Sequence, residues 1–199
     1  SPGIHLFGVV QAALAGAPAV KDLVSGHSGA WTDPASLKAA QQIAEWSTKG
    51  YLTPGTNGVS RDDAVAAFGK GGALFTLTGT WMQQPLHDAL GDDVGFTTLT
   101  STDGKPATTG GQGLAWAITS KSAHPDVAAA YIDFITNAKA AQLLLDSGNL
   151  PTVLPSGYEP KAGTLAGDIA TRYRDVQAAD GVVPYLDYTT PTFYDTLTA

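Results

Sequence analysis

Few residues of this chain have the types and spacing that bond-making chemistry needs. The segment Gly26-His27-Ser28-Gly29-Ala30 fits the G-x-S-x-G turn of a serine nucleophile, except that Ala stands in the last position. Such a turn needs a buried strand before the serine and a helix directly after it. Lys21 and Asp22 interrupt the preceding apolar run, and the next helix begins only at Asp33-Pro34. An α/β serine hydrolase that uses Ser28 is therefore the weaker alternative.

The residue sets that hold metals and redox cofactors do not occur. The chain has no cysteine, which excludes disulfides, thiolate zinc sites and iron–sulfur clusters. The acidic pairs Asp62-Asp63 and Asp92-Asp93 are typical of helix caps and turns. The histidines stand alone, without HxxxH or HxH spacing, at His5, His27, His87 and His124. We expect no metal, no cofactor and no catalysis.

Another group of residues suits the binding of a sugar, which is a flat plate of C–H bonds edged with hydroxyls. Such a ligand needs an aromatic face and hydrogen-bonding groups around its rim. Trp81 suits the aromatic face, because it follows Gly79-Thr80 at the end of an expected strand. The alternative is that Trp81 belongs to the core.

Glycines precede a later expected strand. Gly110, Gly111 and Gly113 lack a Cβ, so their backbone N–H groups can approach a ligand closely. Gln112 between them can both donate and accept hydrogen bonds. A hinge or bulge explains the glycines equally well, and an exposed position explains Gln112.

An aromatic cluster with one carboxylate lies near the end of the chain. Tyr185-Leu186-Asp187-Tyr188 and Phe193-Tyr194 form the type of wall that complements sugar rings and hydroxyl pairs. Packing beneath the last helix is the alternative for each of these aromatic residues. We take Asp187, Tyr188 and Phe193 as candidate ligand-binding residues, and add His5, which can reach a cleft from the first helix.

The elements that must position these residues are helices mixed with short apolar segments. Asp33 before Pro34, Ser60 before Asp63, and Asn137 are the expected helix caps. Helices are expected over residues 3–16, 34–49, 61–68, 80–90, 125–135, 138–147 and 163–179, and short apolar strands over residues 73–78, 94–99 and 114–119. The class is α/β, with too few strands for a complete doubly wound sheet.

Composition narrows the possible partners. The 199 residues are 43% hydrophobic and 15% charged, which is typical of a globular protein. Acidic residues outnumber basic ones by 18 to 11, and the formal charge is −7 without any basic cluster. This balance disfavours nucleic acid and anionic membrane surfaces. No segment reaches the roughly 18 apolar residues of a spanning helix.

Several stretches in a fixed order are similar to one family. Gly69-Lys70-Gly71-Gly72-Ala73-Leu74-Phe75-Thr76-Leu77-Thr78-Gly79-Thr80-Trp81 is similar to the GKaAm…G-x-W segment of extracellular solute-binding proteins of family 1, the maltose-binding-protein-like carbohydrate receptors of ABC importers. Asp92-Asp93-Val94-Gly95-Phe96 resembles the segment where such chains cross between lobes, and Gly110 to Ile118 resembles the strand crossing back. Residues 120–126, 131–136 and 148–152 follow in the family's order.

The resemblance implies a periplasmic-binding-protein-like fold of type II, with two lobes joined by crossover strands. Family members begin with a strand-rich lobe, so this chain looks like a C-terminal fragment from which most of the N-terminal lobe is absent. Residues 1–93 and 151–199 would form the C-terminal lobe. Residues 94–150 would supply the crossover strands and a segment of the N-terminal lobe.

The resemblance also implies an activity. The protein would be a monomeric extracytoplasmic receptor, lipid-anchored to the cell membrane, that closes over a mono- or oligosaccharide by hinge bending and delivers it to the permease of an ABC importer. A receptor for another polar solute, such as a polyol or glycerol phosphate, is the alternative. A phosphate would need a cation in the cleft, for which the sequence offers Lys70, Lys105 and Arg61.

Overall fold

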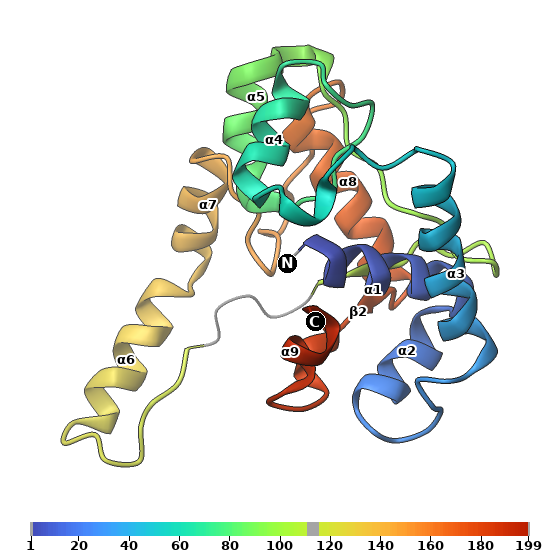
Figure 1. The fold of residues 1–199 in the computed structure, drawn as a ribbon. Coiled ribbons are helices and arrows are strands. Elements are labelled where there is room, and N and C mark those ends of the chain that lie inside the picture. The colour runs from blue at the N-terminus through green and yellow to red at the C-terminus, as the bar shows by residue number, and fades with distance from the viewer. Residues whose placement is uncertain (1, 111–115, 199) are drawn as a thin grey trace.

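A computed structural model describes residues 2–110 and 116–198, which are mostly helical (Figure 1). The α-helices are α1 (Pro2–Ala15), α2 (Ala17–Val24), α3 (Pro34–Thr48), α4 (Arg61–Gly69), α5 (Gln83–Leu90), α6 (Pro125–Ile135), α7 (Ala138–Asp146), α8 (Leu165–Ala178) and α9 (Phe193–Thr198). Single 3₁₀ turns are η1 (Thr56–Gly58), η2 (Thr80–Met82), η3 (Gly91–Asp93) and η4 (Leu186–Tyr188). The strands β1 (Thr108–Thr109) and β2 (Val182–Val183) pair in parallel, with Thr108 opposite Val182.

The expected helix starts are confirmed. Pro34 occupies the first turn of α3 directly after Asp33, which stands at the N-cap position. The side chain of Asp33 makes no capping hydrogen bond and instead accepts one from the backbone N–H of Ala30 at 2.8 Å. Ser60 Oγ accepts a hydrogen bond from the backbone N–H of Asp63 at 3.1 Å, and this cap begins α4 at Arg61. Asn137 caps α7 in the same way. These local devices fix where each helix begins, and the cap at Ser60 places Arg61 in the first turn of α4.

Two expected strands are wrong. Residues 73–78 and 94–99 do not form strands, and neither do residues 116–119, the described part of the third expected strand. A strand persists only when a neighbouring strand takes up its backbone hydrogen bonds. Leu74 and Phe75 are 90% and 81% exposed, so the first of these segments lies uncovered. The expected α/β class therefore rests, among the described residues, on the β1–β2 pair.

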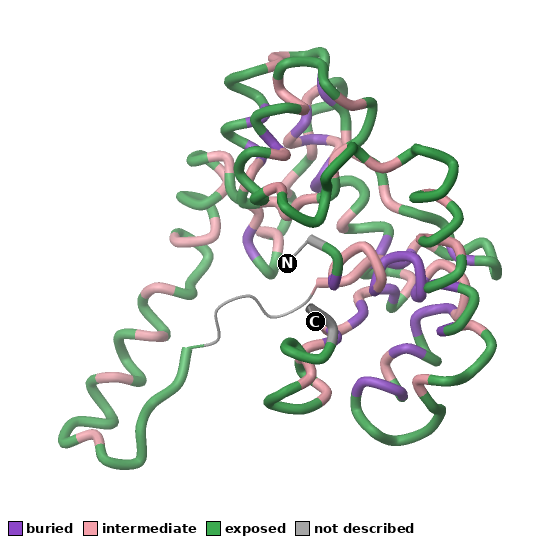
Figure 2. The backbone as a smooth tube through the Cα atoms, viewed as in Figure 1, coloured by how far each residue is buried: buried purple, intermediate pink, exposed green. Residues whose placement is uncertain are grey.

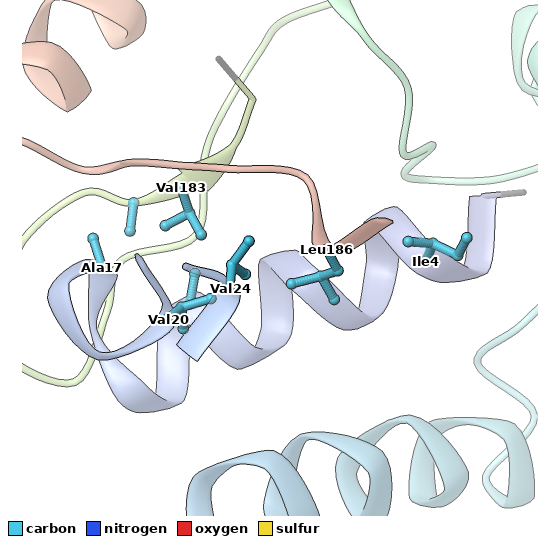
Figure 3. Packing of buried hydrophobic residues seen from close by; sticks show 8 residues of the cluster. Ile4, Ala17, Val20, Val24, Val183 and Leu186 are labelled. Carbon is cyan, nitrogen blue, oxygen red and sulfur yellow. The ribbon is translucent and has the colours of Figure 1, made fainter. Parts of the chain in front are cut away.

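Buried hydrophobic residues form two separate groups, which we call the first core and the second core. Figure 2 marks the buried residues in purple along the backbone. The first core joins α1 and α2 to the β2–η4 segment; Val20 lies near Val183 at one end of it, Ile4 lies at the other end, and Leu186 lies between them (Figure 3). The second core joins α4, α5 and α8 through the buried side chains of Val65, Leu86, Val94, Leu165 and Ile169. Each core fixes a different set of elements.

Helix α1 packs closely against β1. A Cβ at Gly8 would lie 2.6 Å from Thr109 Cγ2, which is too close for two carbon atoms. The glycine therefore permits this close approach. This packing holds His5 of α1 and Thr109 of β1 on neighbouring elements.

Helices α6 and α7 contain no buried residue. Figures 1 and 2 show α6 extending away from the rest of the described chain. The apolar stripe expected on α6 is present but uncovered, since Val127, Tyr131 and Phe134 are 57% to 70% exposed. Isolated helices of this length are marginal in water, because most helical stability comes from packing.

Candidate ligand-binding site

A hollow opens where elements from both cores meet. The elements of the first core contribute His5 of α1, Thr109 of β1 and Tyr185, which directly precedes η4. Helix α4 of the second core contributes Arg61, and the segment that leads into η2 contributes Leu77, Thr78, Gly79 and Trp81. The hollow holds about 390 Å³ of atom-free space, including its open mouth. Much of that space is open solvent, and the centres of water-sized molecules can occupy only about 60 Å³ of it, which is well below the volume of a small-molecule site.

One wall of the hollow is aromatic. The ring of His5 meets the ring of Tyr185 edge-on, with centroids 5.3 Å apart. Tyr188 meets Tyr185 edge-on from another side, at 5.7 Å. These contacts fix the ring of Tyr185 between two neighbours, one from α1 and one from η4. The arrangement gives a rigid apolar surface with polar groups at its edges.

Trp81 lies on another part of the lining. Its side chain is 47% exposed, so the indole belongs to neither core. The indole ring folds back over Gly79, where any Cβ would overlap it. This glycine therefore sets the direction of the ring. The guanidinium carbon of Arg61 lies 6.0 Å from the centroid of the same ring, within cation–π range.

Two buried polar atoms at the hollow have no hydrogen-bond partner among the described residues. One is Thr78 Oγ1 on the lining. The other is Asp187 Oδ1, and the charge of Asp187 acts on both His5 and Tyr185. Buried polar atoms are nearly always hydrogen-bonded in proteins, because leaving one unpaired is costly. Both atoms are sealed from the surface, and Asp187 is not among the lining residues, so a ligand hydroxyl reaches either atom only after the surrounding side chains move.

The hollow shifts two pKa values. Partial burial lowers the pKa of His5 below 6.5; Arg61 acts in the same direction, and Asp187 opposes them. Partial burial also raises the pKa of Tyr185 above 10, with smaller contributions from Tyr188 and Asp187. Near neutral pH, His5 is therefore an uncharged imidazole and Tyr185 a phenol. Each can both donate and accept a hydrogen bond.

The structure brings some of the expected site residues together and separates others. His5 and Trp81 line the hollow, and Asp187 and Tyr188 adjoin it through Tyr185. Phe193 instead packs against Trp31 beside the first core, with ring centroids 4.5 Å apart.

Of the expected glycine segment, residues 110–113, the structure describes only Gly110. The backbone N–H of Gly110 donates a hydrogen bond to the carbonyl oxygen of Val183 at 2.9 Å. This hydrogen bond continues the pairing of β1 with β2. Gly111, Gln112 and Gly113 lie outside the described residues.

Sequence reasoning selected only His5 and Trp81 of the eight lining residues as ligand-binding, with Arg61 as a candidate cation for a phosphate. Thr78 and Leu77 precede the expected Trp81 in the same conspicuous segment, and Tyr185 stands within the aromatic cluster, so these could have been found. Thr109 carried no signal, because only the parallel pairing of β1 with β2 brings it to the hollow.

The turn that contains Ser28 lacks the geometry of a nucleophile turn. It follows helix α2 rather than a strand, and Ser28 is exposed. Its hydroxyl donates to Asp22 Oδ2 at 3.2 Å and not to a histidine. The required base is therefore not in place. Nor do the described residues contain a group of three or more His, Asp or Glu that could hold a metal ion.

Comparison with known proteins identifies one family. The family model described as bacterial extracellular solute-binding protein matches residues 4–171. No curated protein and no solved structure matches the chain. The match includes His5, Arg61, Thr78, Trp81 and Thr109 of the hollow. No helix within residues 2–110 and 116–198 is long and apolar enough to cross a membrane. The chain belongs to the bacterial extracellular solute-binding proteins, which bind solutes outside the cytoplasm.

Proposed function

We propose that this protein is a carbohydrate receptor that hands its sugar to the membrane permease of an ABC importer. Family membership supports a solute-binding receptor that serves such an importer. The observation that carries the choice of a sugar is the half-exposed indole of Trp81, which shares one hollow with the rings of His5 and Tyr185. The C–H face of a sugar stacks on such rings.

The polar groups around these rings match the rim of a sugar. Once the surrounding side chains move aside, Asp187 Oδ1 can accept a hydrogen bond from one hydroxyl, and Thr78 Oγ1 can both donate and accept. Binding then pairs two buried polar atoms that have no partner among the described residues. The free energy gained from these hydrogen bonds adds to the free energy gained from burying apolar surface on Trp81.

The proposal includes closure of two lobes over the sugar. Residues 1–93 and 151–199 form the C-terminal lobe, and residues 94–150 carry the chain to the other lobe and back. The pairing of β1 with β2 supports a crossing near residue 108. The uncovered apolar stripe of α6 supports placing this helix against a second lobe. The closed monomer is then the form that the permease recognises.

The first prediction tests the aromatic platform. Trp81→Ala removes the stacking face and should lower sugar affinity by about 1 to 3 kcal/mol, which is between fivefold and more than a hundredfold. Calorimetric titration of the protein with a panel of mono- and oligosaccharides measures the change.

The matched control is Trp46→Ala, which removes an indole from α3 that does not line the hollow. Its affinity should equal that of the wild type. Unchanged affinity in Trp81→Ala would remove Trp81 from the site, and a wild-type protein that binds no sugar in the panel would overturn the proposed function.

A further inference from the structure

We propose that Asn57 is a site of spontaneous covalent modification, at which the backbone nitrogen of Gly58 displaces the side-chain amide and converts the asparagine to aspartate and isoaspartate. The reaction requires neither a ligand nor a partner protein, so it is independent of the proposed function. Two features of the structure support it: the exposure of the turn η1, and the contacts that restrain the other residues that could react in this way.

The reaction is a cyclisation followed by hydrolysis. The nitrogen of Gly58 forms a bond to Cγ of Asn57, the bond from Cγ to the side-chain nitrogen breaks, and ammonia leaves a five-membered succinimide. Water then opens the ring at either carbonyl, which gives aspartate or its β-linked isomer. A following glycine permits the attack, because it has no Cβ to crowd the approach. Aspartate before glycine forms the same ring by losing water, and such pairs occur at residues 103–104 and 180–181.

The turn η1 leaves Asn57 accessible. Residues 53–58 are exposed, and η1 contains no buried residue. Within the described part of the chain, the side chain of Asn57 makes no hydrogen bond. The N–H of Gly58 donates to the carbonyl of Gly55 at 2.8 Å, so the turn must open before the nitrogen can attack. Opening costs little free energy, because this single 3₁₀ turn has no buried side chain to anchor it.

The two aspartate–glycine pairs are restrained. Asp103 accepts a hydrogen bond from Ser101 Oγ, which lowers the pKa of its carboxyl group, and a carboxylate anion resists attack by a nucleophile. Asp180 forms an ion pair with Lys21, with 2.5 Å between Oδ1 and Nζ. Gly181 is packed so closely that a Cβ on it would lie 2.1 Å from a backbone oxygen. Opening the chain there would disturb β2, which begins at the next residue.

The two other asparagines of the chain are poor reactants. Asn137 Oδ1 caps α7 by accepting a hydrogen bond from the N–H of Ala140 at 3.0 Å. Asn149 Nδ2 donates to the carbonyl of Ser147 at 3.3 Å. The residues that follow these two asparagines are alanine and leucine, whose side chains crowd the attacking nitrogen. Asn57 alone combines a following glycine with an exposed side chain that no hydrogen bond holds within the described residues.

The experiment follows the protein over time in mildly alkaline buffer, which favours deprotonation of the attacking nitrogen. Peptide mass spectrometry locates each conversion, and isoelectric focusing detects the negative charge that it adds to the formal charge of −7. We expect Asn57 to convert before Asn137 and Asn149, with aspartate and isoaspartate both present.

Two variants assign the reacting atoms. Gly58→Ala should slow the conversion about tenfold or more, because the new methyl group crowds the approach. A Cβ at Gly58 meets no atom within 4 Å and its φ is not positive, so this variant should keep the melting temperature of the wild type. Asn57→Gln should stop the conversion, because its longer side chain would have to form a six-membered ring.

Each outcome decides the proposal. Conversion of Asn57 to both products, slowed in Gly58→Ala and stopped in Asn57→Gln, supports it. An Asn57 that stays unmodified in the folded protein overturns it, and so does earlier conversion of Asn137 or Asn149. Aspartate without isoaspartate would mean direct hydrolysis by water, and an unchanged rate in folded Gly58→Ala would exclude attack by the Gly58 nitrogen. Either of these results also overturns the proposal.

Discussion

The lowered pKa of His5 makes the stability of the folded protein depend on pH. Its pKa in the folded protein is lowered, mainly by partial burial, with Arg61 acting in the same direction. In the unfolded chain a histidine titrates near pH 6.5. Between this value and its folded pKa, the unfolded state holds the proton and the folded state does not. The contribution of neutral His5 to stability is therefore present above about pH 6.5 and is lost as pH falls through the lowered pKa.

This linkage predicts a difference between the wild type and His5→Gln, which cannot titrate at that position. As pH falls from 7 to 5, the melting temperature of the wild type should decrease more steeply than that of the variant. Calorimetric scans at matched ionic strength measure both curves, and His87→Gln on the exposed surface of α5 serves as the matched substitution. Parallel curves for the wild type and His5→Gln would contradict the assignment.

Residue type predicted the aromatic character of the site but not which rings form it. Trp81 was found because Gly79 precedes it in a conspicuous segment. Tyr185 and Phe193 are equally aromatic and eight positions apart, yet only Tyr185 reaches the hollow. The deciding factor is the turn η4, whose Leu186 is 1% exposed and anchors the segment in the first core. A single sequence does not show such an anchor.

Among the elements, those with local signals were predictable and those that need a distant partner were not. The caps at Ser60 and Asn137 act within three residues, so the sequence contains all the information they need. Helix α2 was missed because it follows α1 after only Gly16, whose φ is 80°. The short strands β1 and β2 join residues more than 70 positions apart, which no local pattern shows.

The helices α8 and α6 provide a test of which faces are covered. Ile169 of α8 is 4% exposed in the second core, and Ile169→Ala should cost about 2 to 5 kcal/mol of unfolding free energy. Phe134 of α6 is 70% exposed, and Phe134→Ala should change the free energy of unfolding by no more than about 0.5 kcal/mol. Urea unfolding of both variants measures these values. A loss at Phe134 as large as that at Ile169 would mean that another surface covers α6 in solution.

For the whole molecule, closure of two lobes predicts compaction. In this proposal the hollow lies almost entirely on the C-terminal lobe, so a sugar bound there contacts the other lobe only when the lobes are close together, and it should shift the population toward the closed form. The radius of gyration of the intact two-lobed protein, measured by small-angle scattering, should decrease when sugar is added at saturating concentration. Trp81→Ala should need more sugar to reach the same decrease. A saturated wild type with an unchanged radius would identify a rigid receptor without hinge closure.

The lining of the hollow has a thermodynamic consequence, because it draws on both cores. Neither core can unfold while the solute keeps all its contacts, so the solute acts as a removable cross-link between two folding units. At a concentration 100 times its Kd, a solute that binds only the folded state adds about 2.7 kcal/mol to the free energy of unfolding. The empty protein is then free to lose one core before the other, whereas the occupied protein must lose both in one cooperative step. The concentration of the solute would thereby set how cooperatively the receptor unfolds.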